Sequence, residues 1–181
     1  DARFNRATLG IYEMGSTFKI FTTAAALDSG TATLKSGYDA THPIHIGRFT
    51  IEDYHAKRRW LSVPEIFMYS SNIGAAKMAL DVGVTSHRAF LDSVGFMRPA
   101  PLELPEIGAP MAPRQWREIN TMTIAFGHGL AVSPVQVVAA TAAMVNGGIL
   151  NPPTLIRRNG LEGQRGTRVI SPQTSAEMRK L

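Results

Sequence analysis

The chain has 181 residues, of which 44% are hydrophobic and 18% are charged, a composition typical of one globular domain and not of a disordered segment. It contains no cysteine, which excludes disulfides and thiolate metal sites, and no apolar run long enough to cross a membrane. The net charge of +5 favours anionic partners. The densest basic run, Lys57-Arg58-Arg59, is short and has no interleaved aromatic residues, so we expect no nucleic-acid binding.

Residues that favour helix ends mark a series of helices along the chain. Ser62 with Glu65 and Ser133 with Gln136 form capping boxes, in which each side chain satisfies a free backbone N–H at the helix start. The predicted helices run from Ser16 to Ser29, from Ser62, from Asn72 to Asp81, from Ser86 to Val94, from Pro113 through Ile119, from Val137 to Val145 and from Ser171 onward.

Strand signals are few. Ile44 to Ile51 alternates around Gly47 and predicts a small hairpin. Thr154–Arg157 and Arg168–Ile170 are short candidate strands with a glycine-rich turn between them, and the proline-rich stretch from Pro99 to Pro113 predicts an extended loop. The chain should therefore be dominated by helices, with too few strands for a large sheet.

The segment Ser16-Thr17-Phe18-Lys19 carries the first chemical signal. Ser16 begins a predicted helix directly after Gly15, and a helix N-terminus carries partial positive charge that favours a nearby oxyanion. Lys19 lies one turn on, on the same face, and a lysine held in a tight pocket can lose its proton and serve as a base for the serine. The alternative is a simple N-cap with a solvated lysine, because a serine and a lysine three residues apart occur by chance about once in a chain of this size.

A second candidate is the triplet Ser70-Ser71-Asn72, which falls in a loop between two predicted helices. A hydroxyl close to a serine–lysine pair can relay a proton, and an asparagine amide can bind a substrate peptide group. The alternative is again a helix cap, because serine and asparagine are preferred there.

Taken together, these segments resemble the signatures of penicillin-binding proteins, in the right order and over nearly the whole chain. Ser16 and Ser70 are 54 residues apart, an interval similar to that of the family. The matching segments are Tyr12–Lys19 for the first signature, Phe49–Asp53 and Leu61–Glu65 for the linking stretch, Ser70–Gly74 for the second signature, and Phe126–Leu130 with Ser133–Gln136 for the approach to the third.

The resemblance implies a peptidoglycan D,D-transpeptidase, a serine enzyme that β-lactams acylate at the same residue. The backbone N–H of Ser16 would then form half of an oxyanion hole. The implied catalytic residues are Ser16 as nucleophile, Lys19 as general base and Ser70 as proton relay, and the implied substrate-binding residues are Asn72, Ser71 and His128. No cofactor and no metal are expected. His42 and His45 have a metal-like spacing, but Pro43 and the strand-like context favour a structural loop.

The implied fold is the mixed α/β fold of penicillin-recognising serine enzymes, with a central antiparallel sheet and an all-helical subdomain. We expect residues 1–181 to be a partial transpeptidase domain, truncated at both ends, mostly helical and lacking much of that sheet. The third signature, Lys-Thr-Gly, is absent, so this stretch alone should not perform the full reaction. The family usually has proline where Met14 stands, and we expect little effect because Gly15 remains.

Details of the linking stretch resemble the division-type class B subgroup, the FtsI type. That subgroup implies septal cell-wall synthesis at the periplasmic face of the bacterial inner membrane, with an anchor outside this chain. The implied partners are peptidoglycan stem peptides, β-lactam antibiotics and membrane proteins of the divisome.

Two alternatives stay open. One is a serine β-lactamase or D,D-carboxypeptidase, although no glutamate is followed four residues later by asparagine, as the deacylating loop of class A lactamases would require. The other is a non-catalytic penicillin-binding-like module that only recruits partners. The joint presence of Ser16, Lys19, Ser70 and Asn72 argues against it.

Overall fold

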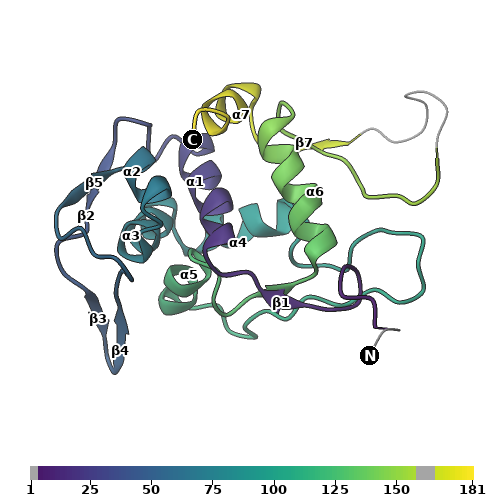
Figure 1. The fold of residues 1–181 in the computed structure, drawn as a ribbon, viewed down its shortest axis with the longest axis horizontal. Helices are drawn as coiled ribbons and strands as arrows, with labels where there is room; N and C mark the ends of the chain where they lie inside the picture. The colour runs from purple at the N-terminus through teal and green to yellow at the C-terminus, as the bar shows by residue number, and fades with distance from the viewer. Residues whose placement is uncertain (1–3, 158–165) are drawn as a thin grey trace.

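Helices dominate the computed structural model, which describes residues 4–157 and 166–181 (Figure 1). The helices are η1 (Gly15–Phe18, a 3-10 helix), α1 (Lys19–Asp28), α2 (Val63–Met68), α3 (Asn72–Val82), α4 (Val84–Ser93), α5 (Glu118–Ile124), α6 (Pro134–Val145) and α7 (Pro172–Met178). The strands are β1 (Tyr12–Glu13), β2 (Gly37–Asp39), β3 (Ile44–Ile46), β4 (Phe49–Ile51), β5 (Trp60–Ser62), β6 (Ala131–Val132), β7 (Ile149–Leu150) and β8 (Thr167–Arg168).

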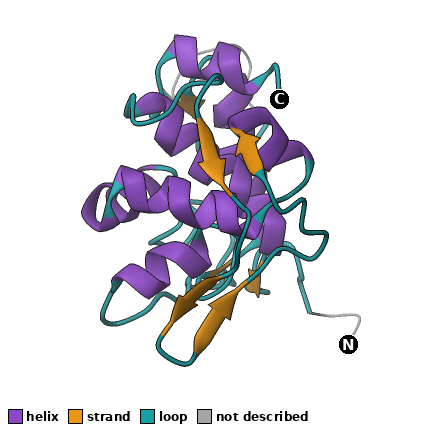
Figure 2. Cartoon of the chain, turned by 90° about the vertical axis from the view of Figure 1, so that its left-hand side faces the viewer, coloured by secondary structure: helices purple, strands orange, loops and turns teal. Residues whose placement is uncertain are grey.

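Within the described residues the strands form only two-stranded antiparallel pairs, β1 with β6, β2 with β5, β3 with β4, and β7 with β8. Figure 2 views the side that carries β2–β5 and shows strand pairs lying in front of the helices. The mostly helical chain without a large central sheet is therefore confirmed.

Helix α1 lies in the middle of the molecule, between α3 and α6 (Figure 1). On one side, Phe18 and Phe21 pack with Phe96, the ring centroids of Phe18 and Phe96 lying 5.1 Å apart. On the other side, Ala25 and Ala26 join a second buried cluster with residues of α2 and α3. Because both faces of α1 are buried, the residue at its first position is held in a fixed place.

Most helix ends agree with the sequence. The capping boxes of Ser62 and Ser133 are present, and Gly83 ends α3. The helix predicted from Pro113 is displaced, because α5 begins only at Glu118. Arg117 is extended, with φ −111° and ψ 169°, and its N–H donates to Asn120 Oδ1 at 2.9 Å. The start of α5 is therefore set by this cap and not by Pro113.

The Ile44–Ile51 hairpin is confirmed as β3 and β4, with Ile44 opposite Ile51. The strand predicted at Thr154–Arg157 is wrong, since Thr154 Oγ1 and the N–H of Leu155 bond instead to the carboxylate of Glu103. The second candidate strand is shifted, because β8 pairs over Thr167–Arg168 with β7. The glycine-rich turn between them lies largely outside the described residues.

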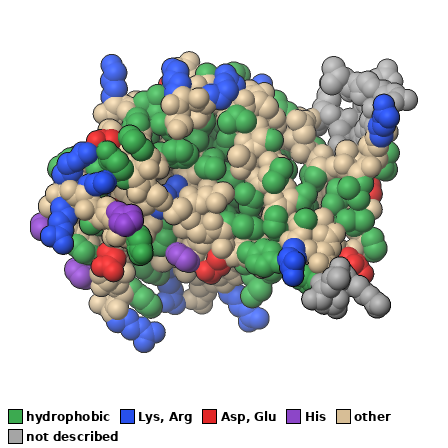
Figure 3. All heavy atoms as spheres, in the orientation of Figure 1, with side chains coloured by type: hydrophobic (Ala, Val, Ile, Leu, Met, Phe, Trp, Pro, Cys, Tyr) green, Lys and Arg blue, Asp and Glu red, His purple; other side chains and the backbone are tan. Residues whose placement is uncertain are grey.

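The surface carries its charges in small groups. Figure 3 shows Lys and Arg side chains scattered around the edge of the visible face, with hydrophobic and neutral side chains between them. In the described part of the chain, the helices are far shorter than the ~20 residues that a membrane span needs, the longest being the 12 residues of α6.

Candidate active site

The nucleophile candidate sits on a tight turn. Gly15 has φ 54°, and Ser16 follows it within the 3-10 helix η1, so the α-helix begins at Lys19 and not at the predicted Ser16. The reason is that the N–H of Lys19 donates to Ser16 O, three residues back, which tightens the turn. The N–H of Ser16 lies in the first turn of η1, where a helix supplies no acceptor of its own.

Lys19 connects both predicted motifs. Its side chain is 3% exposed, and its Nζ lies 3.0 Å from Ser16 Oγ, 2.9 Å from Ser70 Oγ, 2.7 Å from Ser70 O and 2.7 Å from Asn72 Oδ1. The Ser70 hydroxyl also lies 2.9 Å from Ser16 Oγ. The four residues thus form one hydrogen-bonded cluster, although they come from segments more than 50 residues apart.

The acceptors around Lys19 suit a neutral amine. Ser70 O and Asn72 Oδ1 can only accept, so they take the two N–H groups that an uncharged amine carries. The nitrogen lone pair is then left for one hydroxyl, and because the Ser70 hydroxyl donates to Ser16 Oγ, the Ser16 hydroxyl is the one free to donate to it. This geometry lets Lys19 receive the proton of Ser16.

Burial lowers the pKa of Lys19 from 10.5 to about 8, because the charged ammonium loses its water. The negative charge of Asp53 acts in the opposite direction and raises the pKa. A base with a pKa close to neutral pH is present in its neutral form in a useful fraction and still binds a proton well.

The second motif spans the short loop between α2 and α3 and the first residue of α3, Asn72. Ser70 has φ 54°, a left-handed conformation that is uncommon outside glycine, and it brings both its carbonyl and its hydroxyl to Lys19. Ser71 caps α3 by accepting from the N–H of Gly74 at 2.9 Å. Asn72 donates from Nδ2 to Glu52 O at 2.9 Å.

Two predicted substrate residues stand apart from the cluster. Ser71 is 1% exposed, and its hydroxyl donates to Asp53 Oδ2 at 2.7 Å and not to a residue of the cluster. His128 is mostly exposed and pairs through Nδ1 with Glu13 Oε2 at 3.2 Å. The neighbouring Gly127 accepts from the N–H of Gly15 at 3.3 Å, so the loop that bears His128 supports the nucleophile through its backbone.

Sequence reasoning missed two acidic residues. Glu13 accepts from the N–H of Gly129 and from His128, and these bonds lower its pKa. Asp53 accepts from Ser71 and from the N–H of Ile73. Both residues stand inside the segments that matched the family, but nothing in the spacing distinguished them from surface acids.

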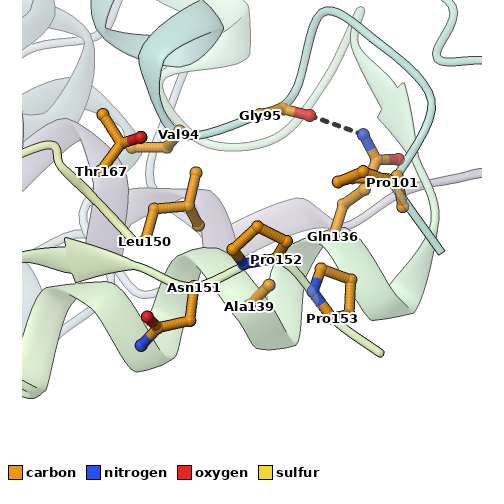
Figure 4. A pocket seen from close by; sticks show the side chains of 11 residues that line it. Val94, Gly95, Pro101, Gln136, Ala139, Leu150, Asn151, Pro152, Pro153 and Thr167 are labelled. Atoms are coloured by element: carbon orange, nitrogen blue, oxygen red, sulfur yellow. Dashed lines mark hydrogen bonds between the residues drawn. The ribbon is translucent and has the colours of Figure 1, made fainter. Parts of the chain in front are cut away.

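A separate pocket lies between α6 and the segment that follows β7 (Figure 4). Its walls are mainly apolar, with Pro101, Pro152 and Leu150 around it, and Gln136 closes one end by donating to Gly95 O at 2.7 Å. None of the described residues that line it is titratable, so they include no acid or base.

Among residues 4–157 and 166–181 there is no group of three or more His, Asp or Glu side chains placed to hold a metal ion. His45, one half of the metal-like pair, instead lies with Nδ1 3.1 Å from Thr50 Oγ1 across the β3–β4 hairpin. The cluster itself offers a serine hydroxyl beside a buried lysine amine.

The chain is similar to known proteins over nearly its whole length. The penicillin binding protein transpeptidase domain family matches residues 2–181. The chain is 42% identical over its whole length to a probable peptidoglycan D,D-transpeptidase FtsI of Caulobacter vibrioides, and 32% identical over 98% of its length to a probable peptidoglycan D,D-transpeptidase PbpC of Pseudomonas aeruginosa. It covers 31% of each of these relatives.

The fold matches solved structures as well. The transpeptidase domain of Burkholderia pseudomallei penicillin-binding protein 3 superposes with a TM-score of 0.90 at 29% identity, over 97% of this chain and 54% of that one. The chain thus spans about a third of the length of these curated relatives and belongs to the penicillin-binding protein transpeptidase family.

Proposed function

We propose that this chain carries the serine nucleophile of a peptidoglycan D,D-transpeptidase. The observation that carries the proposal is the placement of Lys19 Nζ 3.0 Å from Ser16 Oγ, in a buried position that lowers its pKa to about 8. A solvated surface lysine would have neither the acceptors nor the lowered pKa.

In the proposed reaction, Ser16 Oγ attacks the carbonyl carbon between two D-alanine residues of a stem peptide, and its proton moves to Lys19 Nζ. The charge that forms on the carbonyl oxygen is stabilised by the N–H of Ser16. The C–N bond then breaks, and the leaving amine takes a proton from the Ser70 hydroxyl, which Lys19 replenishes over 2.9 Å. D-Alanine leaves, and the remaining peptide is esterified to Ser16.

The second half reverses these steps with a different amine. An amino group of a neighbouring stem peptide attacks the ester carbonyl and gives its proton, through Ser70, to Lys19. Ser16 leaves as the alcohol and recovers the proton, so the new peptide bond forms without loss of a proton or an electron. A β-lactam enters the first half through its strained amide and stays esterified, because no leaving group departs.

The remaining predicted residues support this reaction in different ways. The Asn72 amide nitrogen carries two N–H groups, and Glu52 O takes one, so we assign the other to a substrate carbonyl. Ser71 supports the site indirectly, because its hydroxyl caps α3, the helix that begins with Asn72. We assign His128 a substrate contact from the neighbouring loop, and its contact with Glu13 would orient the ring.

We further propose a role in septal wall synthesis, at the periplasmic face of the inner membrane and with membrane proteins of the divisome as partners. Support comes from the 42% identity with the probable FtsI of Caulobacter vibrioides and from the fold shared with penicillin-binding protein 3. The membrane anchor and the Lys-Thr-Gly strand would be supplied by parts of the protein outside residues 1–181.

Labelling of the whole protein with a fluorescent penicillin tests the proposal. We expect one stable adduct, located on Ser16, and no adduct with Ser16→Ala. Rapid release of the hydrolysed product would instead indicate a β-lactamase, and a folded protein that takes no label would indicate a non-catalytic module.

A further inference from the structure

Asp53 lies in the segment after β4 and uses both oxygens of its carboxylate on one loop. Oδ2 accepts from the Ser71 hydroxyl at 2.7 Å, and Oδ1 accepts from the N–H of Ile73 at 2.9 Å. These two donors lie on either side of Asn72. The carboxylate therefore holds this segment through two hydrogen bonds. Two bonds fix the orientation of the segment as well as its distance from Asp53.

Glu52, the residue before Asp53, adds a third hydrogen bond to the same segment. Glu52 O accepts from Asn72 Nδ2 at 2.9 Å, while Asn72 Oδ1 accepts from Lys19. The pair Glu52–Asp53 thus holds residues 71–73 through three hydrogen bonds. Removal of this support would leave the side chains of Lys19 and Ser16 as the partners of Ser70 and Asn72 in the site.

The loop needs such support because Ser70 is in a left-handed conformation, with φ 54°. The left-handed conformation is unfavourable for a serine, and such conformations persist only where the surrounding structure holds them. In this conformation both Ser70 O and Ser70 Oγ reach Lys19 Nζ, at 2.7 and 2.9 Å. A relaxed Ser70 would lose one or both contacts.

Asp53 also brings a negative charge toward Lys19. Its charge raises the pKa of Lys19, against the larger lowering by burial. The other charged or titratable side chains on the hollow beside Asp53 are Glu52, His42, Tyr54 and Arg58. Of the described residues, Asp53 alone contributes a charge effect to Lys19.

We propose that Asp53 is a positioning residue of this site, which holds the segment of Ser70 and Asn72 against Lys19 and so sets the surroundings of the Lys19 amine. This inference rests on the proposed function for its kinetic readout. It adds to that function a residue outside the two motifs, acting through Ser71, Ile73 and Lys19 and not through the substrate.

Two substitutions separate the two effects. Asp53→Ala removes both hydrogen bonds and the charge. Asp53→Asn keeps an acceptor for Ile73, and its amide can donate to the Ser71 hydroxyl, which accepts as well as donates, so mainly the charge is lost. Asp28→Ala is the matched control, because Asp28 also accepts from a backbone N–H, that of Ser171, and from a hydroxyl, that of Thr174, at the far end of α1.

The experiment measures acylation of the whole protein by penicillin across pH, with non-covalent binding and the chemical step resolved by rapid mixing. For Asp53→Ala we expect the chemical step to slow about a hundredfold, as for a misplacement of about 1 Å, with a smaller effect on binding. For Asp53→Asn we expect the midpoint of the pH profile to move to lower pH. Asp28→Ala should leave both quantities as in the wild type.

The protonation of Lys19 is followed separately by nuclear magnetic resonance of its labelled side chain. A lower pKa of Lys19 in Asp53→Asn supports the inference even if Asp53→Ala fails to fold. An unchanged pKa, or a wild-type chemical step in Asp53→Ala, overturns it. A wild type that is never acylated refutes the proposed function instead, and the resonance measurement still decides the effect of Asp53 on Lys19.

Discussion

The contact between Gly127 and the nucleophile turn leads to a sharp prediction. Gly127 has φ 87°, and a Cβ placed on it would collide with the backbone of Gly15, directly before Ser16. Gly129, two residues on in the same loop, has φ 94°, but a Cβ there would meet Thr123 Oγ1 at an ordinary 3.5 Å. The two alanine substitutions therefore share the backbone strain and differ in the collision.

The shared strain should lower the free energy of unfolding by about 1–2 kcal/mol in each variant, the cost of a left-handed non-glycine residue. Gly127→Ala must in addition push Gly15, and with it Ser16, by about 1 Å. A shift of this size at a reacting atom costs about a hundredfold in rate. We therefore expect Gly127→Ala to be acylated by penicillin about a hundred times more slowly than Gly129→Ala.

The assay compares the acylation rates of both variants with their unfolding by urea, so that the fraction of folded protein is known. Equal acylation rates of the two folded variants would refute the reasoning. They would show that the Gly127 loop does not set the position of Ser16.

Three further predictions concern single side chains. The pKa of Lys19, about 8, predicts an acylation rate that rises with pH as the amine loses its proton, is half-maximal near pH 8 and levels off above it; a rise that continues to about pH 10 would indicate an ordinary lysine. Ser70→Ala removes the relay, and the chemical step should slow by at least about a hundredfold while penicillin still binds; a wild-type rate would assign the relay elsewhere. His87 on α4 is fully buried, its ring nitrogens have no partner among the described residues, and burial lowers its pKa to about 4. As the pH falls, His87 is therefore protonated in the unfolded chain before it is protonated in the folded protein. The free energy of unfolding should have its full value above about pH 6.5 and fall by up to about 3 kcal/mol toward pH 4. Urea unfolding should show this slope reduced in His87→Leu, and an unchanged slope would place its origin in other groups.

Local signals explain why most of the helices could be predicted. The capping boxes at Ser62 and Ser133 satisfy backbone groups within three residues, so the sequence contains the whole interaction. The start of α5 was misplaced because a proline is compatible with a first helical turn but does not require one. The strand at Thr154 was wrong because its polar groups bond to Glu103, about 50 residues away, which no local pattern reveals.

The candidate site likewise has one part that local sequence predicts and another part that depends on distant contacts. Ser16 and Lys19 are one turn apart, so their proximity follows from helix geometry alone. Their contact with Ser70 and Asn72 depends on the packing of α1 against α3, and the sequence indicated it only through the family resemblance. Asp53 could not be recognised, because its role depends on the left-handed turn at Ser70, a conformation that serine rarely adopts.

The most direct test of the account is the mass of the intact protein after incubation with penicillin, followed by digestion to locate the adduct. We expect the mass to increase by one penicillin molecule, the adduct to lie on Ser16, and the increase to disappear in Ser16→Ala. A folded wild type without an adduct, or an adduct on another residue, would contradict the assignment of Ser16 as the nucleophile.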